Sequence, residues 1–82
     1  MSDSIQLELL GTSGCHLCDI AEKIVRRIAP PLGAKVKLVD IADSDTLVEQ
    51  FGMSIPVLRY SNEQTLCWPF DEQQLIHWLE SL

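Results

Sequence analysis

Two cysteines with the spacing CxxC lie near the start of the chain, within GTSGCHLCDIAEK, and they are its clearest chemical signal. Cys15 and Cys18 could form a reversible disulfide, supply two metal ligands, or pack as small apolar residues. Zinc takes four ligands, commonly from two such pairs, and the only further thiols and imidazoles are Cys67, His16 and His77. A loop bracketed by glycines is a poor place to bury two thiols. We therefore predict a redox-active dithiol and no metal site.

The residues behind the dithiol predict the helix that positions it. From His16 to about Ala29, apolar residues recur at the i, i+3, i+4, i+7 spacing of one helix face. Cys15 then stands at the helix N-terminus, where unpaired backbone N–H groups and the helix dipole favour a thiolate. Thiols in this setting have pKa values of about 3.5 to 7.5. We predict that Cys15 attacks a substrate disulfide and that Cys18 resolves the resulting mixed disulfide.

The hydrophobic pattern of the whole chain predicts elements in the order β-α-β-α-β-β-α. Strands are predicted over residues 5–10, 35–41, 55–60 and 65–68. Helices are predicted over residues 16–29, after an N-cap among residues 43–45 and up to Gly52, and after Asp71, where Gln74 completes a capping box. A β-α-β start joins two parallel strands by a right-handed crossover, and the last two strands form an antiparallel hairpin across a turn at 61–64. The prediction is an α/β fold, a four-stranded mixed sheet flanked by three helices, in one domain over residues 1–82.

These features together resemble the thioredoxin-like superfamily, and within it the small bacterial glutaredoxin-like proteins. The resemblance rests on CHLCD, GMSIPVLR and LCWPFDEQQLIHWL, and it covers nearly the whole chain. It implies a thioredoxin/glutaredoxin fold and a thiol-disulfide oxidoreductase of cell redox homeostasis, which reduces or exchanges disulfides of proteins or small molecules. It also implies that Pro56 follows a cis peptide bond and faces the dithiol. The backbone of Ile55 would then pair with an extended substrate segment.

Further residues are candidates for substrate binding. His16 and Leu17 fill the middle of the motif, and His16 could either stabilise the thiolate or be an exposed, neutral side chain. Trp68 and Phe70 could either form the wall of a substrate groove or fill the core under the last helix. Asp71 matches the acidic position at the start of that helix in the family.

Departures from the glutaredoxin pattern argue against glutathione as the natural partner. The middle of the motif is His-Leu rather than Pro-Tyr, and Thr12 and Ser13 stand where a basic residue usually meets a glutathione carboxylate. The Gly-Gly pair before the last helix is replaced by residues 68–70. We expect no tightly bound cofactor. Two other functions stay open. One is binding of a bridging iron–sulfur cluster together with glutathione. The other is a non-catalytic binding module, and the intact dithiol argues against it.

Cys67 is not expected to join the redox pair. In the sheet order that the resemblance implies, its strand lies two places from the first strand, which is roughly 10 Å at about 4.8 Å per step. A disulfide needs Cα atoms within about 7 Å of each other. We therefore predict that Cys67 is a packed thiol.

The composition narrows the partners and the compartment. The chain has 82 residues and a formal net charge of −6, from twelve acidic and six basic side chains. This balance argues against nucleic acid and anionic membranes as partners. Three cysteines are an odd count for a secreted disulfide scaffold, and Met1–Ser4 lacks the basic start of a secretory signal. We expect a cytoplasmic monomer.

Overall fold

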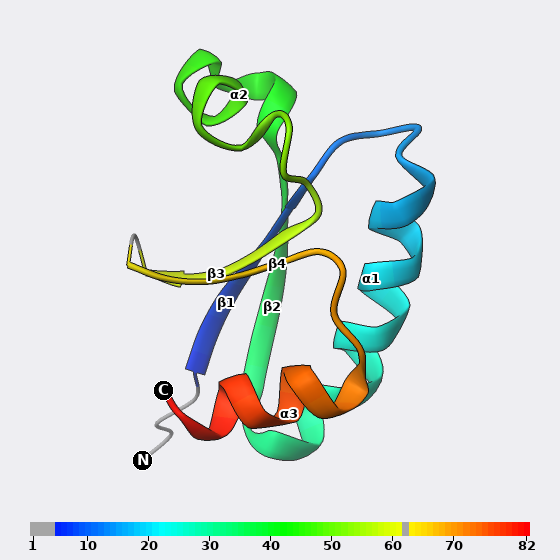
Figure 1. The fold of residues 1–82 in the computed structure, drawn as a ribbon, viewed down its shortest axis with the longest axis vertical. Coiled ribbons are helices and arrows are strands. Elements are labelled where there is room, and N and C mark those ends of the chain that lie inside the picture. Colours follow the sequence, from blue (N-terminus) through cyan, green and yellow to red (C-terminus); the bar gives the residue numbers. More distant parts are fainter. Residues whose placement is uncertain (1–4, 62) are drawn as a thin grey trace.

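A computed structural model describes residues 5–61 and 63–82, which form a four-stranded sheet with helices on both faces (Figure 1). The strands are β1 (Ile5–Gly11), β2 (Ala34–Asp40), β3 (Val57–Ser61) and β4 (Gln64–Cys67). The helices are α1 (His16–Ile28), α2 (Asp45–Phe51) and α3 (Glu72–Glu80), and short 3₁₀ turns cover Pro30–Leu32 and Ile41–Asp43. The predicted order β-α-β-α-β-β-α is confirmed. The expectation of no secretory signal rests on Met1–Ser4, and the predicted turn at 61–64 includes Asn62. Both lie outside the described residues.

The strands lie in the order β2-β1-β3-β4. β1 runs parallel to β2, from the pair Ile5 and Ala34 to the pair Gly11 and Asp40. β3 runs antiparallel to β1 and to β4. The sheet is therefore mixed, as predicted. Because β1 is an inner strand, its carboxyl end lies between the ends of its two neighbours, β2 and β3.

Two apolar clusters hold the helices against the sheet. Leu9 belongs to the cluster under α1 and α3, whereas Leu10 belongs to the cluster under α2. Successive strand residues point to opposite faces, so α1 and α3 cover one face and α2 the other. Burying a leucine or valine side chain contributes about 1.5–3 kcal/mol, so these contacts fix the start of α1 relative to the sheet.

Local signals explain where the helices begin and end. Asp71 and Gln74 form the predicted capping box: Asp71 Oδ1 accepts from the Gln74 N–H at 2.8 Å, and Gln74 Oε1 accepts from the Asp71 N–H at 3.0 Å. Ser44 caps α2 by accepting from the Leu47 N–H at 3.3 Å. α1 ends before Pro30, which lacks the N–H for a further α-helical hydrogen bond and instead begins a 3₁₀ turn. None of the helices in the described part of the chain is long and apolar enough to cross a membrane.

Candidate redox site

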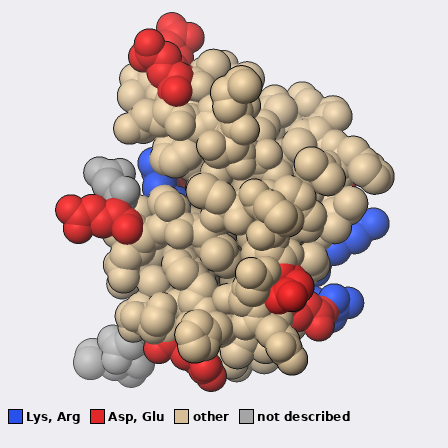
Figure 2. Space-filling model, viewed as in Figure 1, with Lys and Arg blue, Asp and Glu red and all other residues tan. Residues whose placement is uncertain are grey.

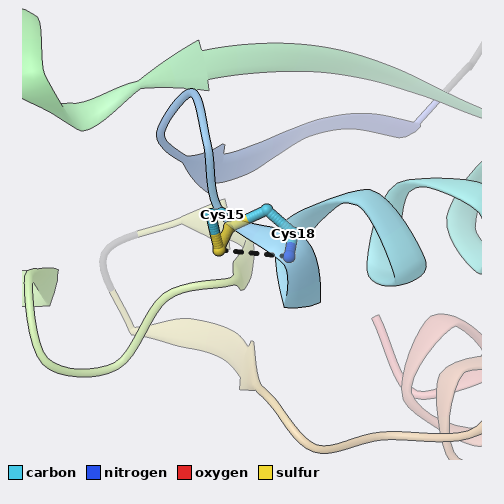
Figure 3. The surroundings of a disulfide bond; sticks show 2 residues. All are labelled: Cys15 and Cys18. Carbon is cyan, nitrogen blue, oxygen red and sulfur yellow. Dashed lines mark hydrogen bonds between the residues drawn. A yellow bond between two sulfur atoms is a disulfide. The ribbon is translucent and has the colours of Figure 1, made fainter.

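Cys15 and Cys18 are joined by a disulfide at the N-terminus of α1, with their Cα atoms 5.2 Å apart (Figure 3). Cys15 is the N-cap of the helix, and its Sγ accepts from the Cys18 N–H at 3.2 Å. The loop before it closes when the Cys15 N–H donates to the Thr12 carbonyl at 3.4 Å. Gly14 has φ +79°, a conformation that glycine adopts without strain. The CxxC spacing thus places one sulfur where the helix leaves its backbone N–H groups unpaired.

The two cysteines differ in exposure. Cys18 is only 9% exposed and lies against β1, whereas Cys15 is half-buried. Gly11 makes this packing possible, because a Cβ on Gly11 would lie 2.9 Å from Cys18 Sγ. A side chain at position 11 would collide with the disulfide. The more accessible cysteine is therefore the one at the helix N-cap.

Pro56 and Trp68 lie in segments at the same end of the sheet as the dithiol. Leu10 pairs with Val57, and one residue further on lie Gly11 in β1 and Pro56 just before β3. The Trp68 N–H donates to the Pro56 carbonyl at 3.0 Å. The Ile55–Pro56 and Trp68–Pro69 peptide bonds are both cis. Gly11, Pro56 and Trp68 thus follow one another across neighbouring strands, at the end of the sheet that carries the dithiol.

The other predicted substrate-binding residues differ in what they expose. His16 and Leu17 are exposed between the cysteines, and Leu17 keeps 46% of its surface. Ile55 is half-buried against the cluster under α2, and its N–H donates to the Phe51 carbonyl at 3.1 Å. Pairing of a substrate with the Ile55 N–H would therefore compete with this bond. Asp71 is exposed, and its carboxylate caps α3.

The rings of Trp68 and Phe70 pack edge to face, with centroids 5.1 Å apart. Phe70 is 4% exposed and belongs to the core cluster under α1 and α3. Phe70 therefore has almost no surface to offer a substrate and instead fills the core under the last helix, which was the second of the two alternatives for this residue. Trp68 is half-buried against the same cluster and keeps some exposed surface.

The prediction of a packed thiol at Cys67 is wrong, because Cys67 is an exposed free cysteine. It pairs with Val57 across the hairpin, so both side chains lie on the α2 face of the sheet. The cluster under α2 buries Val57, but β4 is the outermost strand and its Cys67 lies outside that cluster. The edge position of the strand, which the apolar pattern does not reveal, leaves this thiol in solvent.

Sequence reasoning also missed a groove on the other side of the dithiol. A cavity of about 240 Å³ opens between β1, β2 and the first turns of α1. Its lining is Leu9, Gly11, Thr12, Ser13, Cys18, Asp19, Glu22, Leu38, Val39 and Asp40. One sequence signal could have indicated it: acidic residues at 19 and 22 lie on one side of a helix that packs beside a parallel strand.

Charged side chains leave much of one face free. Figure 2 shows acidic and basic side chains around the rim of this face, with few over its centre, where the connection from β4 to α3 begins. In residues 5–61 and 63–82, no three His, Cys, Asp or Glu side chains gather as a metal site would require.

A thioredoxin fold with a CxxC disulfide at the start of its first helix defines a class of protein, and comparison with known families agrees. Residues 6–80 match the model of the glutaredoxin-like domain (DUF836), so the chain belongs to this family. No curated protein matches the chain.

Solved structures give the same fold. The X-ray structure of the Northeast Structural Genomics target protein XcR50 from X. campestris is 32% identical, with a TM-score of 0.79 over 93% of this chain and 97% of that chain. Its solution structure gives 36% identity and a TM-score of 0.76, over 93% and 94% of the two chains. Thioredoxin 1 from Thermosipho africanus TCF52B is 15% identical, with a TM-score of 0.70 over 93% and 91% of the chains, which shows the shared fold.

Proposed function

We propose that this protein is a thiol-disulfide oxidoreductase, with Cys15 as its nucleophile and Cys18 as its resolving thiol. The observation that carries the proposal is the position of the disulfide. Cys15 is the more exposed of the two cysteines, caps α1, and accepts a hydrogen bond from the Cys18 N–H at its Sγ. In the reduced protein the same N–H and the positive end of the helix dipole favour a thiolate at Cys15.

The reaction starts from the reduced dithiol and a substrate disulfide. The Cys15 thiolate attacks one substrate sulfur, forms a mixed disulfide, and releases the other substrate sulfur as a thiolate, which takes up a proton. Cys18 loses its proton and attacks Cys15 Sγ, which releases the second substrate thiol. Two electrons pass from the protein dithiol to the substrate, and the protein ends as the Cys15–Cys18 disulfide of this structure. A thiol or dithiol reductant must return it to the reduced form.

We propose protein disulfides, rather than glutathione, as the main substrates. Thr12 and Ser13 supply no cation in front of the dithiol, and Arg59 is held at 2.7 Å by Glu8. Leu17, between the two cysteines, and part of Trp68, in a segment at the same end of the sheet, offer apolar surface, which suits an extended peptide segment. A dithiol that must stay reduced also fits the reducing cytoplasm, where we place the protein.

Replacing Cys15 tests this function. We expect the Cys15→Ser variant to lose about 100-fold or more in its rate of reducing a peptide disulfide with dithiothreitol as the final reductant, because serine cannot form the mixed disulfide. The Cys67→Ser variant is the matched control, since it removes an exposed thiol that lies outside the CxxC pair. Undiminished turnover by the Cys15→Ser protein would overturn the proposal.

A further inference from the structure

The groove beside Cys18 lies on the side of the dithiol away from Pro56. Gly11 pairs with Asp40 of β2 on one side, whereas Pro56 precedes β3 on the other side of β1. The volume of about 240 Å³ is below the roughly 300–1,000 Å³ of pockets that hold drug-sized ligands. It is therefore suited to a single side chain rather than to a cofactor.

The floor of the groove is apolar. Leu9 and Leu38 are paired in the parallel register of β1 and β2, so their side chains lie on the same face of the sheet as α1. Leu9 is buried, but Leu38 is 47% exposed, and both line the groove. An exposed leucine beside a redox disulfide offers a surface on which an alkyl chain can pack.

The rim of the groove is acidic. Three acidic residues line it, Asp19, Glu22 and Asp40, and the lining contains no lysine, arginine or histidine. Arg26 pairs with Glu22 at 2.7 Å, whereas none of the ion pairs in the described part of the chain involves Asp19 or Asp40. Two acidic residues therefore line the groove beside its apolar floor, and neither forms an ion pair in the described residues.

Lys23 stands four residues after Asp19 on the same side of α1, but no ion pair joins the two in the described part of the chain. Lys37 pairs in register with Glu8, one residue before Leu9, and so belongs to the opposite face of the sheet. A long side chain with an apolar stem and a cationic end fits both parts of the groove, since such chains lay the stem on apolar surface and keep the charge at the polar rim.

We propose that this groove binds a lysine or arginine side chain that flanks the reactive cysteine of a disulfide substrate. The proposal rests on the proposed function and names its substrate class: segments with basic residues next to the disulfide. The Cα atoms of Cys15 and Cys18 are 5.2 Å apart, and successive residues of an extended segment are about 3.3–3.6 Å apart. A residue one or two positions from a substrate cysteine bound to Cys15 therefore spans a distance comparable to that from Cys15 to Cys18, which lines the groove.

The test compares two peptide disulfides. These are the symmetric disulfides of acetyl-Ala-Lys-Cys-Lys-Ala-amide and of acetyl-Ala-Glu-Cys-Glu-Ala-amide, reduced by the reduced protein and followed by chromatography of the peptide thiols. Each rate is divided by the rate of the same disulfide with dithiothreitol, which removes the intrinsic effect of the flanking charges. We expect a preference of about threefold to tenfold for the lysine peptide at low salt, given the modest energy of exposed ion pairs. The preference should shrink in high salt.

The double variant Asp19→Asn/Asp40→Asn tests whether the groove carries the preference. Asparagine keeps the size and an acceptor oxygen, so the Asp40 contact to the Ala42 N–H at 2.9 Å can persist. We expect this variant to reduce the lysine peptide more slowly and the glutamate peptide faster, a crossover that partial unfolding cannot produce. The matched control, Glu49→Gln/Glu63→Gln, removes the same net charge from exposed positions outside the groove and should keep the preference.

The outcomes separate the two proposals. Equal normalised rates for both peptides, or a preference that survives the groove variant, would overturn the groove while leaving the redox function intact. A preference lost equally in the control variant would attribute it to net charge and also overturn the groove. Reduction of neither peptide by the wild-type protein would instead contradict the proposed function.

Discussion

Gly11 shows how closely the sheet packs against the redox pair. Because Gly11 has no side chain, Cys18 can lie close to it. A Cβ added at Gly11 would lie 2.9 Å from Cys18 Sγ and 3.2 Å from Cys18 Cβ. In the oxidised protein the disulfide fixes that sulfur, whereas in the reduced protein the Cys18 side chain can rotate away. The space at Gly11 therefore matters most to the oxidised form.

Substituting Gly11 should shift the balance between the two redox forms. We expect Gly11→Ala to lower the free energy of unfolding of the oxidised protein by about 1–3 kcal/mol through overpacking, and that of the reduced protein by less. Urea unfolding of both forms measures this, and the disulfide should become easier to reduce by dithiothreitol. Ser13→Ala, at an exposed position in the loop that follows β1, is the control. A variant equally destabilised in both forms, or in neither, would contradict this account of Gly11.

At the scale of elements, caps set the ends of the helices that hold the site. Cys15 caps α1, which carries the dithiol, and Asp71 caps α3, whose Leu75 and Leu79 are buried under the sheet. α3 also contacts α1 through the ion pair of Arg27 with Glu72. The support of the redox helix therefore depends in part on α3.

The cap of α3 can be tested on its own. We expect Asp71→Ala to lower the free energy of unfolding by about 1 kcal/mol, in the range of roughly 0.5–2 kcal/mol for a lost N-cap, as measured by urea unfolding. Asp71→Asn should retain most of the stability, because the amide oxygen can still accept from the Gln74 N–H. If asparagine costs as much as alanine, the carboxylate acts through its charge and not as a hydrogen-bond cap.

At the scale of the whole molecule, local patterns predicted more of the fold than of the site surface. The period of the apolar residues indicated each strand and helix, and the spacing of Asp71 and Gln74 indicated a cap that the structure contains. Which side chains stay exposed depends on where the helices lie on the sheet, and no local pattern encodes that. Cys67 is exposed for this reason on the edge strand, and Leu38 is exposed in a groove that α1 leaves open.

The order of chemical events at the dithiol is the central claim, and trapping tests it most directly. A Cys18→Ser/Cys67→Ser protein, reduced and then exposed to a peptide disulfide, should accumulate one mixed disulfide, which peptide mapping by mass spectrometry locates at Cys15. The protein keeps the nucleophile but lacks the thiol that would resolve it. The matched Cys15→Ser/Cys67→Ser protein should form far less adduct, because Cys18 is the more buried sulfur. Absence of an adduct at Cys15, or preferential trapping at Cys18, would contradict the account.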